Sequence, residues 1–177
     1  MQKKTVIALT LLLGLSTSIF TIKGLPLVRF PINDITTNTT NPPAFSAVIS
    51  LRNKGNNSVE YGGPLVAARQ AILYADIQPI NSDLSLENAF KKALRIAKNM
   101  GWKIIATDEK NGIIEAVDTT PIFRFKDDVI IRVTNIGIGI GIGIGSRIDL
   151  RSQSRIGLSD FGKNASRIRS FIKNFSS

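Results

Sequence analysis

The segment Ser146–Ile156, SRIDLRSQSRI, alternates between apolar or small side chains and charged or polar ones. Side chains of a β-strand point in turn to its two faces, so this period of two predicts a strand with two chemically different faces. One face should carry Ile148, Leu150 and Ile156. The other should carry Arg147, Asp149, Arg151 and Arg155.

The region before this strand predicts more strands. Trp102–Thr107 and Gly112–Asp118 are joined by DEKNG, whose Asn-Gly pair favours a tight turn. Two further strands are expected around Ile122–Phe125 and Val129–Val133. Alternation would place Arg132 opposite Val129 and Arg124 opposite Phe123 and Phe125. The result is an arginine-rich sheet face, with Glu115 and Asp149 as nearby acids.

Helices are predicted on both sides of these strands. Apolar residues spaced three and four apart follow Ser85, and Gly101 provides a stop. A second apolar stripe runs from Ala165 to Phe175, with Ser159 or Asp160 available as the N-cap. The order helix, strands, helix predicts an α+β fold, in which an antiparallel four- to five-stranded sheet has two helices on one face.

The rest of the chain predicts three parts. Residues 1–22 read as a signal peptide or membrane anchor, because MQKK precedes the uncharged, mostly apolar stretch Thr5–Ile22, which would form an apolar helix. Residues 23–82 are expected to be an extended arm with a short helix around Leu65–Leu73. Residues 83–177 would form the α+β domain. The lysines before the apolar stretch predict that the domain lies outside the cytoplasm. The protein would then be either anchored in the inner membrane, facing the periplasm, or secreted to the periplasm.

Composition excludes several chemistries. The chain has no cysteine and no histidine, so disulfides, thiolate nucleophiles, Cys/His zinc sites and Ser-His-Asp triads are all ruled out. We expect no cofactor and no metal. The net charge of +10 is concentrated in residues 119–177, which hold ten basic and four acidic groups. Nucleic acid is nevertheless a disfavoured partner, because the chain carries an export signal and few stacking aromatics besides phenylalanine.

The repeat Ile136–Gly145 resembles a glycine-rich nucleotide loop at first sight. Such a loop must lead into a helix whose N-terminus holds the phosphate, whereas a period-two strand follows here. We interpret the repeat as an inserted hairpin tip. The alternative is an apolar finger that touches a membrane or a partner.

Two motifs, FRFKDDV and RSQSRIGLSDFGKNASRIRSF, together with NDITTNTTNPPAF and YADIQPI, resemble the bacterial family known as domain of unknown function 1499. The resemblance covers about Ile32–Phe175 and implies an envelope-associated protein with no established activity. The Ile-Gly repeat replaces a short turn of that family. The motif positions used below are Arg124, Asp127, Asp128, Arg151, Ser152, Ser154, Arg155, Asp160, Asn164 and Arg167.

These residues allow more than one interpretation. A structural network would pair Asp127 or Asp128 with Arg151, Arg155 or Arg167, while Asp160 caps the last helix. The same arginines could bind an anion or a lipid headgroup. The adjacent acids Asp127 and Asp128 could serve a carboxylate-dependent hydrolase, although neighbours in a strand face opposite ways. The leading hypothesis is a non-catalytic, membrane-anchored or exported envelope module that binds an anionic lipid or another envelope protein. The alternatives are that hydrolase and a lipid or nucleic-acid binder acting through the basic C-terminal third.

Overall fold

A computed structural model describes residues 21–22, 25–26, 31–136 and 145–177. The chain divides into two units, Met1–Phe30 and Pro31–Ser177. In the first unit, the short strands β1 (Thr21–Ile22) and β2 (Leu25–Pro26) pair with each other. The predicted N-terminal helix lies almost entirely outside the described residues. Among the residues that are described, no helix is long and apolar enough to cross a membrane.

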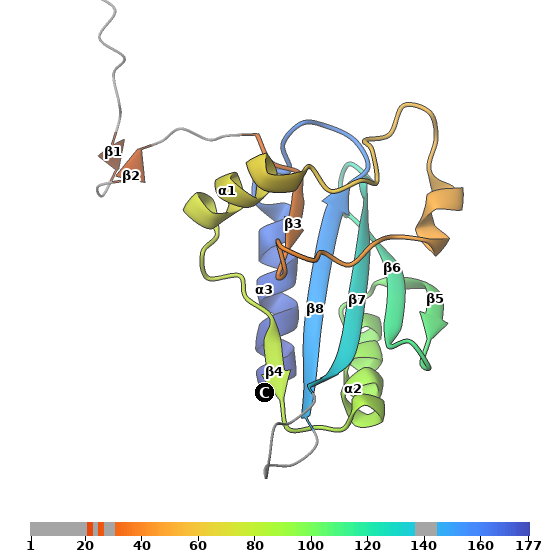
Figure 1. Cartoon of the computed structure of the whole chain (residues 1–177). Coiled ribbons are helices and arrows are strands. Elements are labelled where there is room, and N and C mark those ends of the chain that lie inside the picture. Colours follow the sequence, from red (N-terminus) through yellow and green to blue (C-terminus); the bar gives the residue numbers. More distant parts are fainter. Residues whose placement is uncertain (1–20, 23–24, 27–30, 137–144) are drawn as a thin grey trace, which may run out of the picture. The chain divides into compact units, whose positions relative to one another are not determined.

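The second unit is built on a six-stranded antiparallel sheet (Figure 1). Its strands run in the order β3-β8-β7-β6-β5, and β4 pairs with the other half of β8. Their bounds are β3 Asp34–Thr36, β4 Ile80–Ser82, β5 Lys103–Asp108, β6 Ile113–Thr119, β7 Lys126–Ile136 and β8 Gly145–Ser154.

The α+β class and the antiparallel sheet are confirmed, but the predicted count of four to five strands is wrong. The additional strands β3 and β4 come from the segment predicted as an arm. Each has only three residues, which is too short to show a period of two in the sequence.

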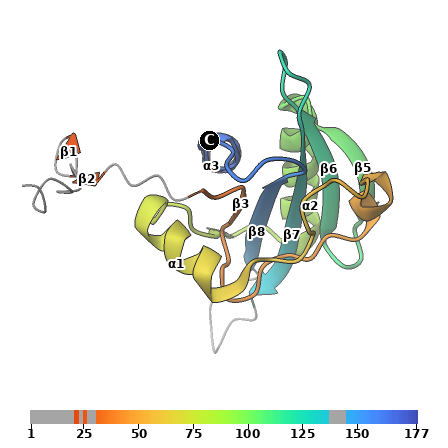
Figure 2. The same cartoon turned by 90° about the horizontal axis from the view of Figure 1, so that it is seen from above.

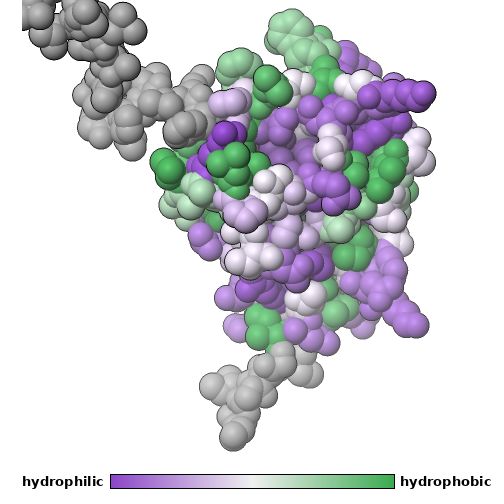
Figure 3. Space-filling model, turned by 45° about the horizontal axis from the view of Figure 1, so that its top comes forward, coloured by the Kyte–Doolittle hydropathy of each residue, from purple (hydrophilic) through white to green (hydrophobic). Residues whose placement is uncertain are grey.

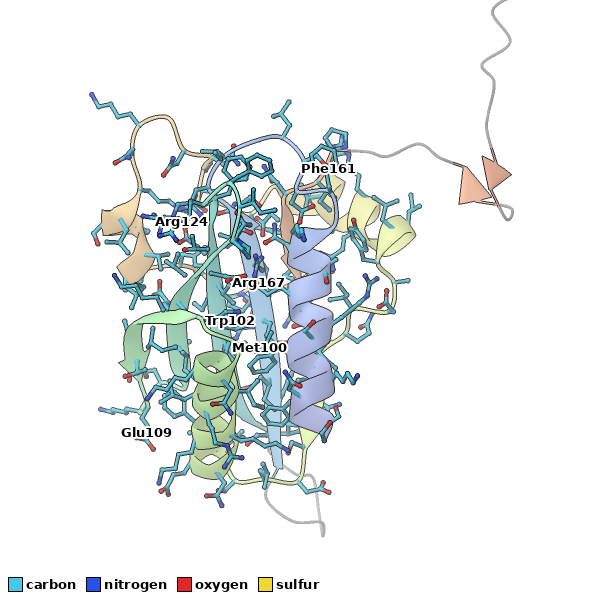
Figure 4. The ribbon with its side chains drawn as sticks, turned by 180° about the vertical axis from the view of Figure 1, so that it is seen from behind. Met100, Trp102, Glu109, Arg124, Phe161 and Arg167 are labelled. Carbon is cyan, nitrogen blue, oxygen red and sulfur yellow. The ribbon has the colours of Figure 1, made fainter. Side chains whose placement is uncertain are left out.

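Helices α2 (Leu86–Asn99) and α3 (Lys163–Ser176) pack against each other and against one face of the sheet, as Figure 4 shows from behind. The Oγ of Ser85 accepts a hydrogen bond from the N–H of Asn88, and Gly101 follows the helix with a φ of 78°. The main core lies between this face and the helices, where Ile148, Leu150 and Phe171 are fully buried.

The other face of the sheet is covered by residues 37–61, which cross in front of β8 and β7 in Figure 1. This segment includes the 3-10 helix η1 (Ala47–Leu51), and the buried Phe45 and Val48 pack on Val117 and Ile130. The short helix expected around Leu65–Leu73 is present as α1 (Gly63–Leu73), a third α-helix. Figure 2 shows α1 beyond the β3 edge of the sheet.

The two ends of β7 differ in what lies beside them. The predicted strand around Ile122–Phe125 is wrong: these residues form a loop in which Arg124 has a φ of 56°, and the N–H and C=O of Phe125 bond to Thr120. At the opposite end of the sheet, β7 and β8 remain paired up to Ile136 and Gly145. The body of the Ile-Gly repeat, 137–144, lies outside the described residues.

Candidate functional site

The alternation predicted for β8 places its arginines and its apolar residues on opposite faces. Ile148 and Leu150 lie in the core beneath the helices, while Arg151 and Arg155 bond to groups on the covered face. Ile156 follows the end of the strand and is exposed. In β7, Asp127 is paired with Ser154 and Asp128 with Gln153, so the two adjacent carboxylates point to opposite sides of the sheet.

Asp128 belongs to a buried cluster on the covered face. Its carboxylate accepts hydrogen bonds from the guanidinium of Arg155 at 2.7 Å and from Nε of Arg52 at 2.7 Å. Arg52 also donates to Oε1 of Gln153, and Arg155 donates to the carbonyl of Leu51. The covering segment is thereby tied to β7 and β8 by charge-assisted hydrogen bonds.

Arg151 forms a second part of this cluster. Of the three arginines predicted to pair with Asp127 or Asp128, Arg155 and Arg167 do so, whereas Arg151 pairs with Asp34 through two contacts of 2.8 and 3.0 Å. Its guanidinium carbon lies 4.8 Å from the ring centre of Phe45 and 5.5 Å from that of Tyr61. The hydroxyl of Tyr61 is buried and has no hydrogen-bond partner in the described part of the chain.

Burial raises the pKa of Tyr61 to about 12. Loss of hydration on burial is the main cause of this raised pKa; the negative charge of Asp34 contributes to it, and Arg151 opposes it. Asp34 thus binds Arg151 and also helps to raise the pKa of Tyr61.

A separate network lies on the helix face, where Arg167 of α3 reaches the sheet, as labelled in Figure 4. Arg167 donates to Asp127 and to Asp118, each at 2.6 Å. It also donates to Oγ of Ser152 and to the side chain of Asn164. Asn164 in turn donates to Oγ of Ser154, which completes a buried polar layer between α3 and β8.

Asp160 prepares the start of α3. Its two carboxylate oxygens accept hydrogen bonds from the N–H groups of Gly162 and Asn164, at 2.8 and 2.6 Å. The helix formally begins after Gly162, so Asp160 caps the first turn from two residues further back. The predicted capping role is present in this shifted form.

An apolar groove opens where β7 begins and β8 ends. The loops 120–125 and 155–162 form its walls, and its volume is about 530 Å³. Phe123 and Phe125 stack with their ring centres 5.6 Å apart. The large apolar side chains of this lining are 45–83% exposed; they are Ile122, Phe123, Phe125, Ile156 and Phe161.

Six of the thirteen residues that line the groove are polar or charged, namely Thr120, Asp127, Ser154, Ser159, Asp160 and Lys163. Asp127 and Ser154 contribute to its lining from the strands, and Lys163 stands exposed at its edge. Oδ2 of Asp127 is held by Arg167, whereas Oδ1 accepts no hydrogen bond from the residues that the structure describes. Arg124 does not line the groove, and its side chain makes no hydrogen bond or ion pair within the described ranges.

This arrangement limits the chemistry that the motif residues can perform. Asp127 and Asp128 cannot act as a carboxylate pair on one substrate, because the sheet separates them. The guanidinium groups of Arg151, Arg155 and Arg167 already bind carboxylates of the chain. The described residues contain no cluster of three or more acids that could hold a metal ion. A large groove whose exposed surface is mostly apolar has instead the general form of a binding site.

The sequence did not reveal several residues of these sites. Asp34 and Arg52 lie in polar stretches without periodicity, so nothing marked them as partners of β7 and β8. The groove residues lie on loops, and only the exposed aromatics of FRF and DFG could have drawn attention to them. Spacing rules do not predict which loops meet in space.

The fold and the site together define a small α+β protein with buried ion-pair networks and an apolar groove. Comparison with protein families gives a match over residues 34–175 to the family described as "Protein of unknown function (DUF1499)". The chain therefore belongs to this family. The search of curated proteins found no match to the chain.

Proposed function

We propose that the chain is a non-catalytic envelope module whose groove holds the hydrocarbon chain of an amphiphilic lipid. The observation that carries this proposal is the groove itself: two loops enclose about 530 Å³, and most of the exposed surface that lines this volume is apolar. An acyl chain matches such a lining, because it needs no hydrogen bonds and gains free energy when it leaves water.

The polar groups nearby support a binding role rather than catalysis. A hydrolase needs a free nucleophile or base within hydrogen-bond reach of the substrate. Here, each carboxylate of the two networks binds an arginine or a helix N-terminus. Asp127 has one carboxylate oxygen free beside the groove, and Asp118, its cross-strand neighbour on the same face, binds the same arginine, Arg167.

The proposed location rests on the sequence. The apolar stretch that follows MQKK would export the protein or anchor it in the inner membrane, with Pro31–Ser177 on the periplasmic side. A lipid would then be available to the groove.

Titration of the full chain with a fluorescent long-chain fatty acid tests this proposal. Ile156→Asp places a charge in the apolar lining, so we expect the affinity to fall about tenfold or more. Ile136→Asp is the matched control, because it introduces the same charge on an exposed isoleucine at the opposite end of β7. Any binding by the N-terminal segment would be common to both variants. Equal affinities in the two variants would refute the groove as the binding site.

A further inference from the structure

The two groove loops also expose large apolar side chains to solvent. Leu158 is 80% exposed and does not line the groove, and the groove residues Ile122 and Phe161 are 83% and 78% exposed. Figure 3 turns this end of the molecule forward and shows hydrophobic side chains there, separated by hydrophilic ones. Large apolar side chains grouped on neighbouring loops mark a surface that contacts a partner or a membrane.

Positively charged side chains lie on the same segments as these apolar side chains. Arg124, Lys126 and Lys163 are exposed on the same loops and strand end. The nearest acids are already engaged, since Asp127 and Asp118 bind Arg167, and Asp160 binds the backbone of α3. The three cations are therefore left to interact with solvent or with an external anion. Exposed apolar side chains together with exposed cations suit a bilayer that contains anionic lipid.

The path of the chain supplies an independent argument. The N–H of Asp160 donates to the carbonyl of Ile32, and the side chain of Asn33 donates to the carbonyl of Gly157. The compact unit therefore begins beside the loop that carries Leu158 and Phe161. The residues before Pro31 include the stretch that the sequence predicts to be an export signal or anchor.

From these observations we propose that the loops 120–125 and 155–162 dock on an anionic lipid bilayer. Ile122, Leu158 and Phe161 enter the interface, and Arg124, Lys126 and Lys163 contact lipid phosphates. The mouth of the groove then faces the bilayer, so the inference extends the proposed function by naming the membrane as the source of the lipid. A second copy of the chain is a poorer occupant, because the three cations of each copy would repel each other.

The lack of cysteine allows a direct test, because a single introduced cysteine can be labelled alone. The full chain is reconstituted in vesicles of phosphatidylcholine and phosphatidylglycerol, with a polarity-sensitive label at Leu158→Cys. The matched controls are Lys110→Cys, which lies in the turn between β5 and β6, and Ile136→Cys. Both control sites lie at the opposite end of the sheet, as the label of Glu109 in Figure 4 indicates.

We expect the label at Leu158 to report an apolar environment and to be quenched by a quencher carried on the lipid acyl chains. Labels at the control sites should remain aqueous. In the Leu158→Cys background, Arg124→Glu should weaken the insertion equilibrium by about fivefold for each unit of charge removed, and added salt should weaken it as well. Lys110→Glu in the same background should have little effect.

Three results would overturn the proposal. The label at Leu158 could remain as aqueous as the label at Lys110, or all sites could be quenched equally. The Leu158 label could also become apolar without vesicles as the protein concentration rises, which would indicate a second copy as the occupant. Because Leu158 lies outside the groove lining, insertion of its label would support docking even if Ile156→Asp left fatty-acid binding unchanged.

Discussion

At the scale of single residues, the buried pair of Arg151 and Asp34 on the covered face affects the stability of the fold. Arg151 and Asp34 are both almost fully buried, and each holds the other by two hydrogen bonds. The net value of such a pair is small, since both charges lose their hydration on folding. Loss of one partner is much more costly, because the remaining charge is left buried and uncompensated.

The first prediction follows from this pair. Arg151→Met should lower the free energy of unfolding by about 3–5 kcal/mol, because it leaves Asp34 without its counter-charge. Urea denaturation measures the loss. Adding Asp34→Asn should restore part of it, whereas adding Asp127→Asn should not, because Asp127 binds Arg167 on the other face. Recovery with Asp127→Asn instead would show that the pairs are assigned incorrectly.

The second prediction concerns the unpartnered hydroxyl of Tyr61. Tyr61→Phe removes a buried polar atom that has no hydrogen bond in the described structure, so stability at neutral pH should stay equal or rise by up to about 1 kcal/mol. The folded-state pKa of about 12 lies above the ordinary value of 10.0. Both states are protonated below pH 10, and above it the unfolded state releases the proton more readily. The wild type should therefore lose stability from pH 10 to 12.

Alkaline urea denaturation of the wild type and of Tyr61→Phe tests this second prediction. The variant should lack the part of the alkaline loss that belongs to Tyr61. Tyr74→Phe is the control, because Tyr74 lies by Arg169, outside this cluster. Identical alkaline profiles for the wild type and Tyr61→Phe would contradict the raised pKa.

At the scale of elements, the start of α3 depends on one side chain. Asp160 satisfies two N–H groups of the first turn and also interacts favourably with the helix dipole. Asp160→Ala should therefore cost about 1–2 kcal/mol of stability, measured by urea denaturation. Asp160→Asn keeps an acceptor oxygen and should cost less. A loss as large in the asparagine variant as in the alanine variant would show that the charge, rather than the hydrogen bonds, dominates.

The strands differ in how well the sequence predicts them. The alternation of β8 was readable because apolar or small side chains alternate with charged or polar ones along the whole strand. The turn between β5 and β6 was readable from its Asn-Gly pair, and the structure shows why glycine is needed: a Cβ at Gly112, whose φ is 67°, would lie 2.0 Å from the carbonyl oxygen of Val133. In contrast, β3 and β4 are formed through pairing with β8. Their own residues carry no periodic signal, so tertiary pairing decides their structure.

The paired ends of β7 and β8 give a fourth prediction. Ile136 and Gly145 are partners in the hairpin, a geometry that a two-residue turn can close. Replacing residues 137–144 with Asn-Gly should therefore keep the fold and leave the free energy of unfolding within about 1 kcal/mol of the wild type or above it, because shorter loops cost less entropy. A loss of several kcal/mol would show that the replaced residues contribute buried contacts.

At the scale of the whole molecule, the site could be predicted only in part. The motif arginines and acids were recognised as a network from their charges and their alternation, and Arg155 and Arg167 do bind Asp128 and Asp127. The groove was not foreseen, because it arises where two loops meet, 30 or more residues apart in the sequence. The remaining partners, Asp34 and Arg52, come from the covering segment. We therefore expect the compact unit to need this segment, in addition to residues 83–177, in order to fold.

The last prediction compares two truncations, residues 31–177 and residues 83–177. The first keeps the whole compact unit and its core, which begins at Ile32, so it should unfold cooperatively with the stability of that unit in the full chain. The second corresponds to the predicted α+β domain alone. It lacks the buried Ile35, Ile77 and Ile80, each worth about 1.5–3 kcal/mol on burial.

The shorter truncation also removes charges that buried groups of β7 and β8 require. Arg151 would lose Asp34, and Asp128 would lose one of its two arginines, Arg52. An unpaired buried charge costs about 3–5 kcal/mol, and small domains have a total stability of about 5–15 kcal/mol. Residues 83–177 should therefore fail to show a cooperative transition in circular dichroism and urea denaturation. If they fold as stably as residues 31–177, the segment 31–82 is an accessory arm, and the ion pairs that tie it to the sheet contribute little.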